Sequence, residues 1–414
     1  MRDRDIIRSL VSELMVEAQK PVQQERVRLW TLNNDLRSEK PMVWITEIPF
    51  GELEDKVDML RVQCSDPRLQ WLERGLRQKL FTARRLMTDE VVEPVYRVTM
   101  ALENVWFDVE TREKQIRQGA AYIQSHHYEP VIKDFDDIEK IKMPMVRHNA
   151  EETFRQVEFY DALFGDIMPI VVTGSPWLTY FTAWDDLVRW TGVTEALIDL
   201  TERPDFIHAI MRRMTDSTLL LMTQAEEQGI LRLVNDQPRI GSGATGYTDD
   251  LPRPGGAAKD DGAVRLQDCW GFATAQIFSD VSPEMHEEFA LQYERQILVR
   301  AGLSYYGCCE PLHNKMELMK TIPNLRKISV SAWCDVAKTA ELAGRRYVFS
   351  HKPNPAMLAE DVFNAKRAEQ DIRDRLARSG GMPCEIVMKD ISTIRGDPQR
   401  VIDWCRVAYD VCNR

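Results

Sequence analysis

The 414-residue sequence contains no apolar run that approaches the 18 residues needed for a membrane-spanning helix. Its first 20 residues, MRDRDIIRSLVSELMVEAQK, are charged and amphipathic and lack the continuous apolar core of a signal peptide. No run of six or more arginines and lysines occurs either. We therefore expect a protein with no membrane span and no secretory leader.

The chain has fewer basic than acidic side chains. Its 54 lysines and arginines and 65 aspartates and glutamates give a net charge of −11. General nucleic-acid binding requires a basic surface that displaces counterions. The charge balance therefore argues against nucleic-acid binding and favours small molecules or other proteins as partners.

Cysteine is also sparse, with eight residues in the chain, at positions 64, 269, 308, 309, 334, 384, 405 and 412. This density is too low for a disulfide scaffold. Together with the missing leader it predicts a cytoplasmic protein, whose thiols stay available for metal binding or catalysis.

The sequence contains no G-x-S-x-G, no P-loop and no H-E-x-x-H, and no G-x-G-x-x-G opens the first helix. Strand-like and helix-like segments alternate instead, and this alternation predicts parallel pairing. About eight strands follow residue 41, which predicts an α/β fold of the (β/α)₈ TIM-barrel type over residues 41–414. Residues 1–40 form an N-terminal helical segment. The predicted strands are 41–50, 91–102, 166–174, 230–236, 303–310, 325–331, 346–351 and 384–390.

The segment YYGCCEP closes one of these strands and contains Cys308, Cys309 and Glu310. Chemistry in a barrel occurs where strands end, and thiolates with a carboxylate are donors that suit zinc. Only one of two adjacent cysteines on a strand normally faces the barrel mouth, because side chains alternate, although a strand end can bend enough to bring both inward. The alternative is that both cysteines are small buried apolar residues.

Further polar residues follow other predicted strands. Asp390 is a candidate third metal ligand or acid–base group, or else a helix cap or an ion-pair partner. His351 and Lys352 can bind an anion or a substrate carboxylate, although a single histidine also often has a structural role. Asp236 stands at the end of another strand and is a further candidate catalytic residue.

Several segments in order resemble the uroporphyrinogen decarboxylase superfamily. They are FSDVSPEMHEEFALQYERQIL, the strand ending in YYGCCEP, RRYVFSHKPNPAML and EIVMKDISTIRGDPQRVIDW, and the resemblance covers roughly residues 150–410. The resemblance is closer to the corrinoid-linked methyltransferases than to true uroporphyrinogen decarboxylases. The chain lacks the arginine-rich N-terminal substrate motif of the decarboxylases, since PMVWITEIPF has no arginine.

This resemblance implies a (β/α)₈ barrel that binds Zn²⁺ and transfers methyl groups with a corrinoid-binding protein as partner. The methyltransferases bind zinc through H-x-C and a later cysteine. Here Tyr306-Gly307-Cys308 stands at H-x-C, and Lys389-Asp390 stands where the later cysteine is expected. The implied metal ligands are therefore Cys308, with Cys309 and Asp390.

The leading hypothesis is a zinc-dependent methyltransferase that moves a methyl group between a small methylated compound and a corrinoid protein. Cys308, Cys309 and Asp390 would bind the metal, with Glu310 as a possible further ligand or catalytic group. Asp236, His351 and Lys352 would orient the substrate. The alternatives are a decarboxylase-like lyase acting on a small carboxylated substrate, and a non-catalytic barrel that binds a small ligand.

Overall fold

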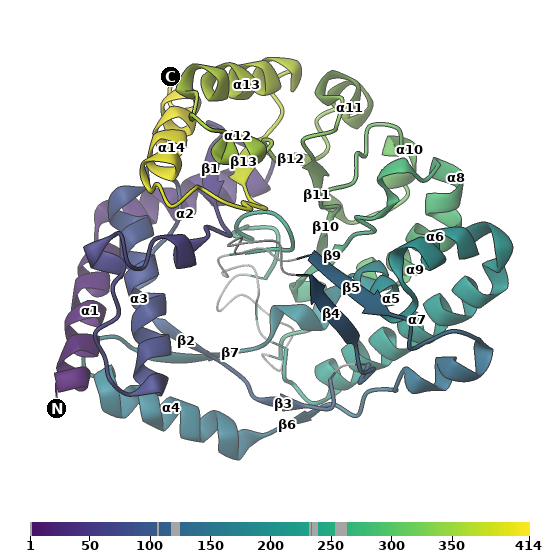
Figure 1. Cartoon of the computed structure of the whole chain (residues 1–414), viewed down its shortest axis with the longest axis horizontal. Coiled ribbons are helices and arrows are strands. Elements are labelled where there is room, and N and C mark those ends of the chain that lie inside the picture. Colours follow the sequence, from purple (N-terminus) through teal and green to yellow (C-terminus); the bar gives the residue numbers. More distant parts are fainter. Residues whose placement is uncertain (1, 106, 117–124, 232, 234–238, 253–262) are drawn as a thin grey trace.

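The computed structural model describes residues 2–105, 107–116, 125–231, 233, 239–252 and 263–414. Seven strands form its main sheet, and every hydrogen-bonded neighbour in this sheet runs parallel. In sheet order they are β1 (Met42–Ile45), β13 (Cys384–Met388), β12 (Val348–His351), β11 (Leu325–Val330), β10 (Leu303–Tyr306), β9 (Trp270–Ala273) and β8 (Tyr180–Phe181). Figure 1 shows this curved sheet with the C-terminal helices outside it.

The main sheet is buried on both faces, as parallel sheets in α/β proteins are. Every residue of β1, β9, β10, β12 and β13 is buried. This burial explains why these strands read as short apolar runs rather than as alternating patterns. The predicted α/β barrel fold class is confirmed.

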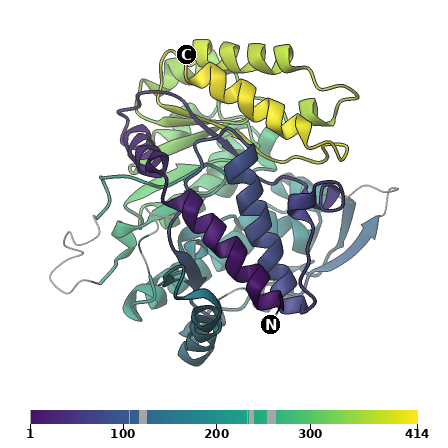
Figure 2. The same cartoon turned by 90° about the vertical axis from the view of Figure 1, so that its left-hand side faces the viewer.

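The helices follow the predicted alternation with the strands. They are α1 (Arg2–Ala18), α2 (Pro21–Asn34), α3 (Pro67–Arg85), α4 (Ala150–Phe164), α5 (Ala183–Thr191), α6 (Val193–Glu202), α7 (Pro204–Glu227), α8 (Pro283–His286), α9 (Gln292–Leu298), α10 (Met316–Met319), α11 (Val336–Ala343), α12 (Ala356–Ala359), α13 (Ala365–Arg378) and α14 (Gln399–Cys412). Asp66 and Ser282 cap α3 and α8 through their side chains. The N-terminal helix α1 packs against α3, and α13 packs against α14 (Figure 2).

Two predicted strands lie outside the main sheet. The segments 91–102 and 166–174 contribute β2 (Tyr96–Thr99) and β7 (Ile170–Thr173), which pair in parallel with each other. The sequence patterns did not identify β8 and β9, because β8 has only two residues and β9 has no β-branched residue. Most of the predicted strand 230–236 lies outside the described residues.

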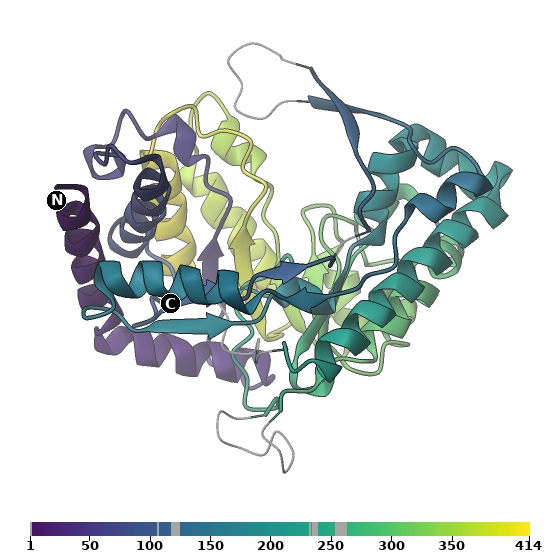
Figure 3. The ribbon, with the colours of Figure 1, turned by 90° about the horizontal axis from the view of Figure 1, so that it is seen from below.

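Smaller elements complete the described fold. The strands β3 (Leu102–Glu103) and β6 (Arg147–His148) pair antiparallel, as do β4 (Arg112–Ile116) and β5 (Ser125–Glu129). Figure 3 shows β4 and β5 projecting from the body of the molecule. The π-helical segment η7 (Glu287–Leu291) joins α8 to α9. The 3₁₀ turns are η1 (Phe50–Glu52), η2 (Asp58–Leu60), η3 (Phe135–Lys140), η4 (Pro176–Thr179), η5 (Leu266–Asp268) and η6 (Phe278–Asp280).

The described part of the glycine-rich segment that begins at residue 239 packs into the interior. Ala244 and Thr245 are completely buried, and the backbone N–H of Ala244 donates to Glu385 of β13 at 3.0 Å. A Cβ atom at Gly243 would come within 2.7 Å of Glu385 Oε1, so only glycine allows this approach. The spacing Gly241, Gly243, Gly246 matches a dinucleotide-binding loop, but residues 247–252 form no helix that could hold a phosphate.

None of the helices in the described ranges combines the length and the apolar character that crossing a bilayer requires.

Candidate functional site

A pocket of about 240 Å³ lies where four neighbouring strands of the main sheet end. Residues 308–309, 331–333, 352–355 and 389–390 line it, and they follow β10, β11, β12 and β13. Parallel strands bring their carboxyl ends to one side of the sheet, which is where α/β barrels carry their active sites. The structure therefore brings together residues that are up to 82 positions apart at one rim.

Both cysteines reach this pocket because the chain bends directly after β10. Gly307 has a φ of 94°, a conformation that side chains with a Cβ rarely adopt. The two sulfur atoms of Cys308 and Cys309 are 3.6 Å apart. Cys308 is buried, whereas Cys309 is partly exposed. Side chains alternate along a regular strand, but the bend after β10 places both Cys308 and Cys309 at the same pocket.

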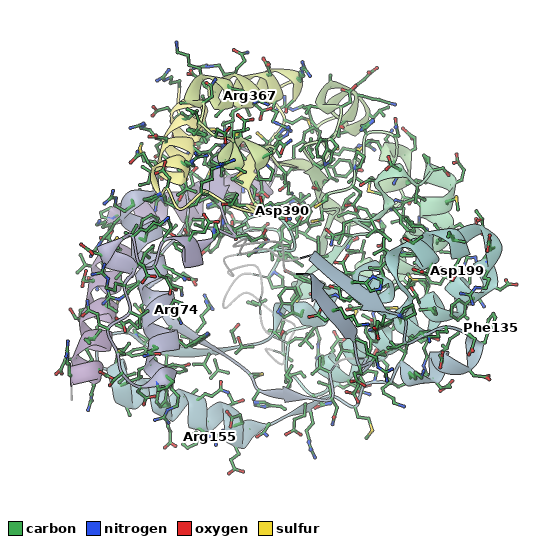
Figure 4. The ribbon with its side chains drawn as sticks, viewed as in Figure 1. Arg74, Phe135, Arg155, Asp199, Arg367 and Asp390 are labelled. Carbon is green, nitrogen blue, oxygen red and sulfur yellow. The ribbon has the colours of Figure 1, made fainter. Side chains whose placement is uncertain are left out.

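Asp390 and Lys389 complete the group around the cysteines. The Sγ atom of Cys309 is 3.7 Å from Oδ2 of Asp390. The ammonium of Lys389 is 3.3 Å from Sγ of Cys308 and 2.8 Å from Oδ2 of Asp390. Figure 4 shows Asp390 beyond the end of β13, beside the centre of the molecule.

The contacts in this group shift the pKa values of the two thiols in opposite directions. The hydrogen bond from Cys309 lowers the pKa of Cys308, and the nearby ammonium of Lys389 lowers it further despite burial. The same contact with Cys308 raises the pKa of Cys309, and burial raises it further. Of the two residues, Cys308 therefore loses its proton more readily.

Glu310 points away from the sulfur atoms although it follows them in sequence. Its fully buried carboxylate accepts hydrogen bonds from the hydroxyl of Thr274 at 2.9 Å and from the backbone N–H of Cys308 at 2.9 Å. Burial raises the pKa of Glu310. The structure thus makes Glu310 a support for the turn at Cys308, and it does not bring this carboxylate into the pocket.

His351 also lies apart from the predicted group. Side chains alternate along β12, so the side chain of His351 faces the outer helices while Lys352 faces the pocket. The Nε2 atom of His351 is 2.8 Å from the hydroxyl of Ser379, just after α13. Burial lowers the pKa of this histidine to about 3, so its ring is neutral at pH 7. Its position is that of a structural hydrogen-bonding residue, the alternative role that a single histidine often has.

Lys352 is a buried ammonium group at the pocket. Its Nζ donates to the hydroxyl of Tyr305 and to Oγ of Ser350, the latter at 2.7 Å. Burial lowers the pKa of Lys352 to about 8, so the group is still largely charged at pH 7. Beneath it, Lys327 and Glu385 form a fully buried ion pair at 2.8 Å.

Asp236, the remaining predicted site residue, lies outside the described residues. Tyr306, which stands where the resemblance has a histidine, does not face Cys308. Its hydroxyl donates to Glu294 at 2.5 Å and is 2.6 Å from Nε2 of His286, within the helical layer. Tyr306 is therefore not placed to act as a metal ligand beside Cys308.

Three further residues shape the site: Lys389, Tyr305 and Glu47. Lys389 was considered only as an ion-pair partner of Asp390, Tyr305 as part of a strand, and Glu47 not at all. Glu47 accepts a hydrogen bond from the backbone N–H of Asp390 at 2.8 Å, across 343 positions of sequence. The predicted strand 41–50 includes Glu47, and only the earlier end of the observed β1 at Ile45 places this residue at a strand exit.

The fold is similar to that of a solved structure, a methyltransferase from Methanosarcina mazei. The two chains share 11% sequence identity with a TM-score of 0.51, over 93% of this chain and 98% of that chain. No family model matches the sequence. No curated protein matches it either. At this identity the likeness concerns the fold alone.

Proposed function

We propose that this protein is a zinc-dependent methyltransferase that moves a methyl group between a small methylated compound and a corrinoid protein. Zinc would be held by Cys308, Cys309 and Asp390 at the pocket. The observation that carries this proposal is the row of two sulfur atoms and one carboxylate at the strand ends, with spacings of 3.6 and 3.7 Å. The similar fold of a methyltransferase supports the choice of reaction.

The donor types and spacings fit zinc. Two sulfurs and an oxygen bound tetrahedrally to one zinc ion would be separated by about 3.5–3.8 Å. Across the described ranges, however, no three His, Cys, Asp or Glu side chains are already arranged as a metal cage. The ammonium of Lys389 instead lies within 3.3 Å of Sγ of Cys308 and within 2.8 Å of Oδ2 of Asp390. A bound cation would take over this charge, and Lys389 would turn away.

When bound, zinc supplies a Lewis acid that activates a thiol or stabilises the leaving oxygen or nitrogen of a methyl donor. The chain itself prepares the site. Glu310 holds the backbone of Cys308, and Glu47 holds the backbone of Asp390, so two ligands are positioned by carboxylates behind them. Lys352 presents a positive charge to the substrate in the same pocket. A cytoplasmic location would keep both thiols reduced.

The reaction is tested with methylcob(III)alamin as methyl donor and 2-mercaptoethanol as acceptor, without oxygen. The thiolate sulfur takes the methyl group, and the electron pair of the cobalt–carbon bond stays on cobalt as cob(I)alamin. We expect zinc-loaded protein to accelerate the loss of the methylcobalamin absorbance, and Cys308→Ser to abolish this acceleration. Cys412→Ser, a buried cysteine in α14, is the matched control. Equal rates in wild type and Cys308→Ser would contradict the proposal.

A decarboxylase-like lyase is the second candidate, and the charged Lys352 favours it. A buried ammonium next to a small pocket could hold the carboxylate of a substrate, and an acidic side chain such as Asp390 could protonate the product carbanion. Release of CO₂ from a small carboxylated substrate by metal-free protein would favour this candidate over methyl transfer.

A further inference from the structure

One cation at the pocket, Lys352, contacts no carboxylate of the described residues directly, although Glu385 and Cys308 act on it through space. Lys352 is 5% exposed, and its ammonium contacts three neutral oxygens: Oγ of Ser350 at 2.7 Å, the carbonyl of Ser350 at 3.1 Å and the hydroxyl of Tyr305. In the part of the chain that the structure describes, no carboxylate lies within ion-pair distance of it.

Two neighbouring lysines, in contrast to Lys352, each form an ion pair with a carboxylate. Lys327 is 2.8 Å from Glu385, and Lys389 is 2.8 Å from Asp390. The three lysines lie on three adjacent strands or their exits, so Lys352 is the exception among them. Its lack of a carboxylate partner does not come from a shortage of acidic residues nearby.

A buried charge that lacks an opposite charge costs free energy, because hydroxyl and carbonyl dipoles replace water only in part. The surrounding residues nevertheless hold Lys352 in one position. Its ammonium lies 5.1 Å from the centre of the Tyr305 ring, and Ser350 in turn donates to Glu385 at 2.6 Å. A fixed and unpaired cation beside a pocket is prepared for an anionic ligand.

From this arrangement we infer that the pocket contains a subsite for the carboxylate of a small organic acid, with Lys352 Nζ as its counter-ion. A single unpaired ammonium matches a monoanion better than a phosphate dianion. The exposed indole of Trp333 and the rings of Pro353 and Pro355 give the pocket an apolar wall for the rest of the ligand. The assignment of this acid as the methyl-transfer substrate rests on the proposed function.

The test uses full-length, chelator-treated protein, so that it does not depend on zinc or on methyl transfer. Isothermal titration calorimetry compares benzoate with benzyl alcohol, which has the same ring without the charge. We expect benzoate to bind more tightly than benzyl alcohol, and Lys352→Gln to weaken benzoate at least tenfold without changing benzyl alcohol. Lys338→Gln on α11, an exposed lysine that does not line the pocket, should behave as wild type.

A second measurement needs no variant and guards against misfolding of Lys352→Gln. Benzoate should slow the alkylation of Cys308 by iodoacetamide in the wild type, and benzyl alcohol at the same concentration should not. The inference would be overturned if none of acetate, butyrate and benzoate bound, or if benzyl alcohol bound as tightly as benzoate. It would also be overturned if Lys352→Gln left the affinity for benzoate unchanged, or if equimolar inorganic phosphate displaced benzoate. None of these outcomes alters the zinc content, which tests the proposed function separately.

Discussion

The carboxylate of Glu47 accepts a hydrogen bond from the backbone N–H of Asp390, with 2.8 Å between Oε2 and N. Both residues have a φ of 56° and follow neighbouring strands, β1 and β13. Non-glycine residues rarely adopt this left-handed conformation, and such strain concentrates at functional sites. The other oxygen of Glu47 binds Arg239 at 2.8 Å, so two loops hold Asp390 at the rim of the pocket.

Replacing Glu47 by alanine should therefore weaken zinc binding without removing a ligand. Residues behind a metal ligand commonly contribute about 10–100-fold to metal affinity, and we expect a loss in that range. Competition with a chromogenic zinc chelator measures it. Glu54→Ala, which removes a carboxylate bound to Arg74 instead, is the control. Equal zinc affinities in the two variants would show that Glu47 does not position Asp390.

Cys308 should react with iodoacetamide at a lower pH than an ordinary thiol in chelator-treated protein. Its lowered pKa means that the thiolate persists as the pH falls below about 8.5, the usual thiol value. Lys389→Met removes a cation that stabilises the thiolate, so the rate profile should shift to higher pH. Mass spectrometry of the alkylated peptide gives the rate at each pH. Identical profiles for both proteins would contradict this account of the thiol pair.

Breaking the buried ion pair should destabilise the fold strongly. Lys327→Met leaves the carboxylate of Glu385 buried without its partner, and we expect a loss of about 3–5 kcal/mol in the free energy of unfolding. Urea denaturation followed by circular dichroism measures it. Arg373→Ala breaks an exposed pair with Glu369 and should cost far less, because solvent screens the exposed charges. A similar small cost for both variants would show that the pair carries little stability.

Acid should remove the stabilisation that Glu385 provides. Burial raises the pKa of this carboxyl, but Lys327 and Ser350 together lower it below its ordinary value. A group with a lowered folded-state pKa stabilises the protein above its unfolded pKa, and this stability is lost as the pH falls through the folded value. The free energy of unfolding of wild type should therefore fall below about pH 4, more steeply than that of Lys327→Met/Glu385→Leu.

His351 should be dispensable for ligand binding. His351→Phe removes the hydrogen bond to Ser379 and should cost about 1 kcal/mol of stability. Zinc content and benzoate affinity should remain those of wild type, because the side chain faces the outer helices. If a folded His351→Phe protein lost zinc content or benzoate affinity, His351 would have to take part in binding.

The sequence predicted the barrel, and the grouping of several pocket residues, for the same reason. Alternating strands and helices imply parallel pairing, and parallel pairing brings strand exits together, so Cys308, Lys352 and Asp390 could be grouped before their geometry was known. The direction of a side chain at a strand end depends on the local bend. Glu310 and His351 were grouped with the others although they point elsewhere.

Residues that act through distant contacts could not be predicted. Glu47 and Asp390 are linked by a hydrogen bond between two strand exits, and no local pattern encodes that link. Strand β9 could not be predicted from the sequence for a different reason. Its four buried residues, WGFA, contain a glycine and an alanine, which weaken the strand signal although tertiary burial favours the strand.

The central claim is that Cys308, Cys309 and Asp390 bind zinc, and metal analysis of the purified protein tests it most directly. Inductively coupled plasma mass spectrometry after zinc loading and desalting should find close to one zinc per chain in wild type and in Cys412→Ser. Cys308→Ser, Cys309→Ser and Asp390→Ala should each lose most of it. A wild-type protein without stoichiometric zinc, or ligand variants that retain it, would contradict the account.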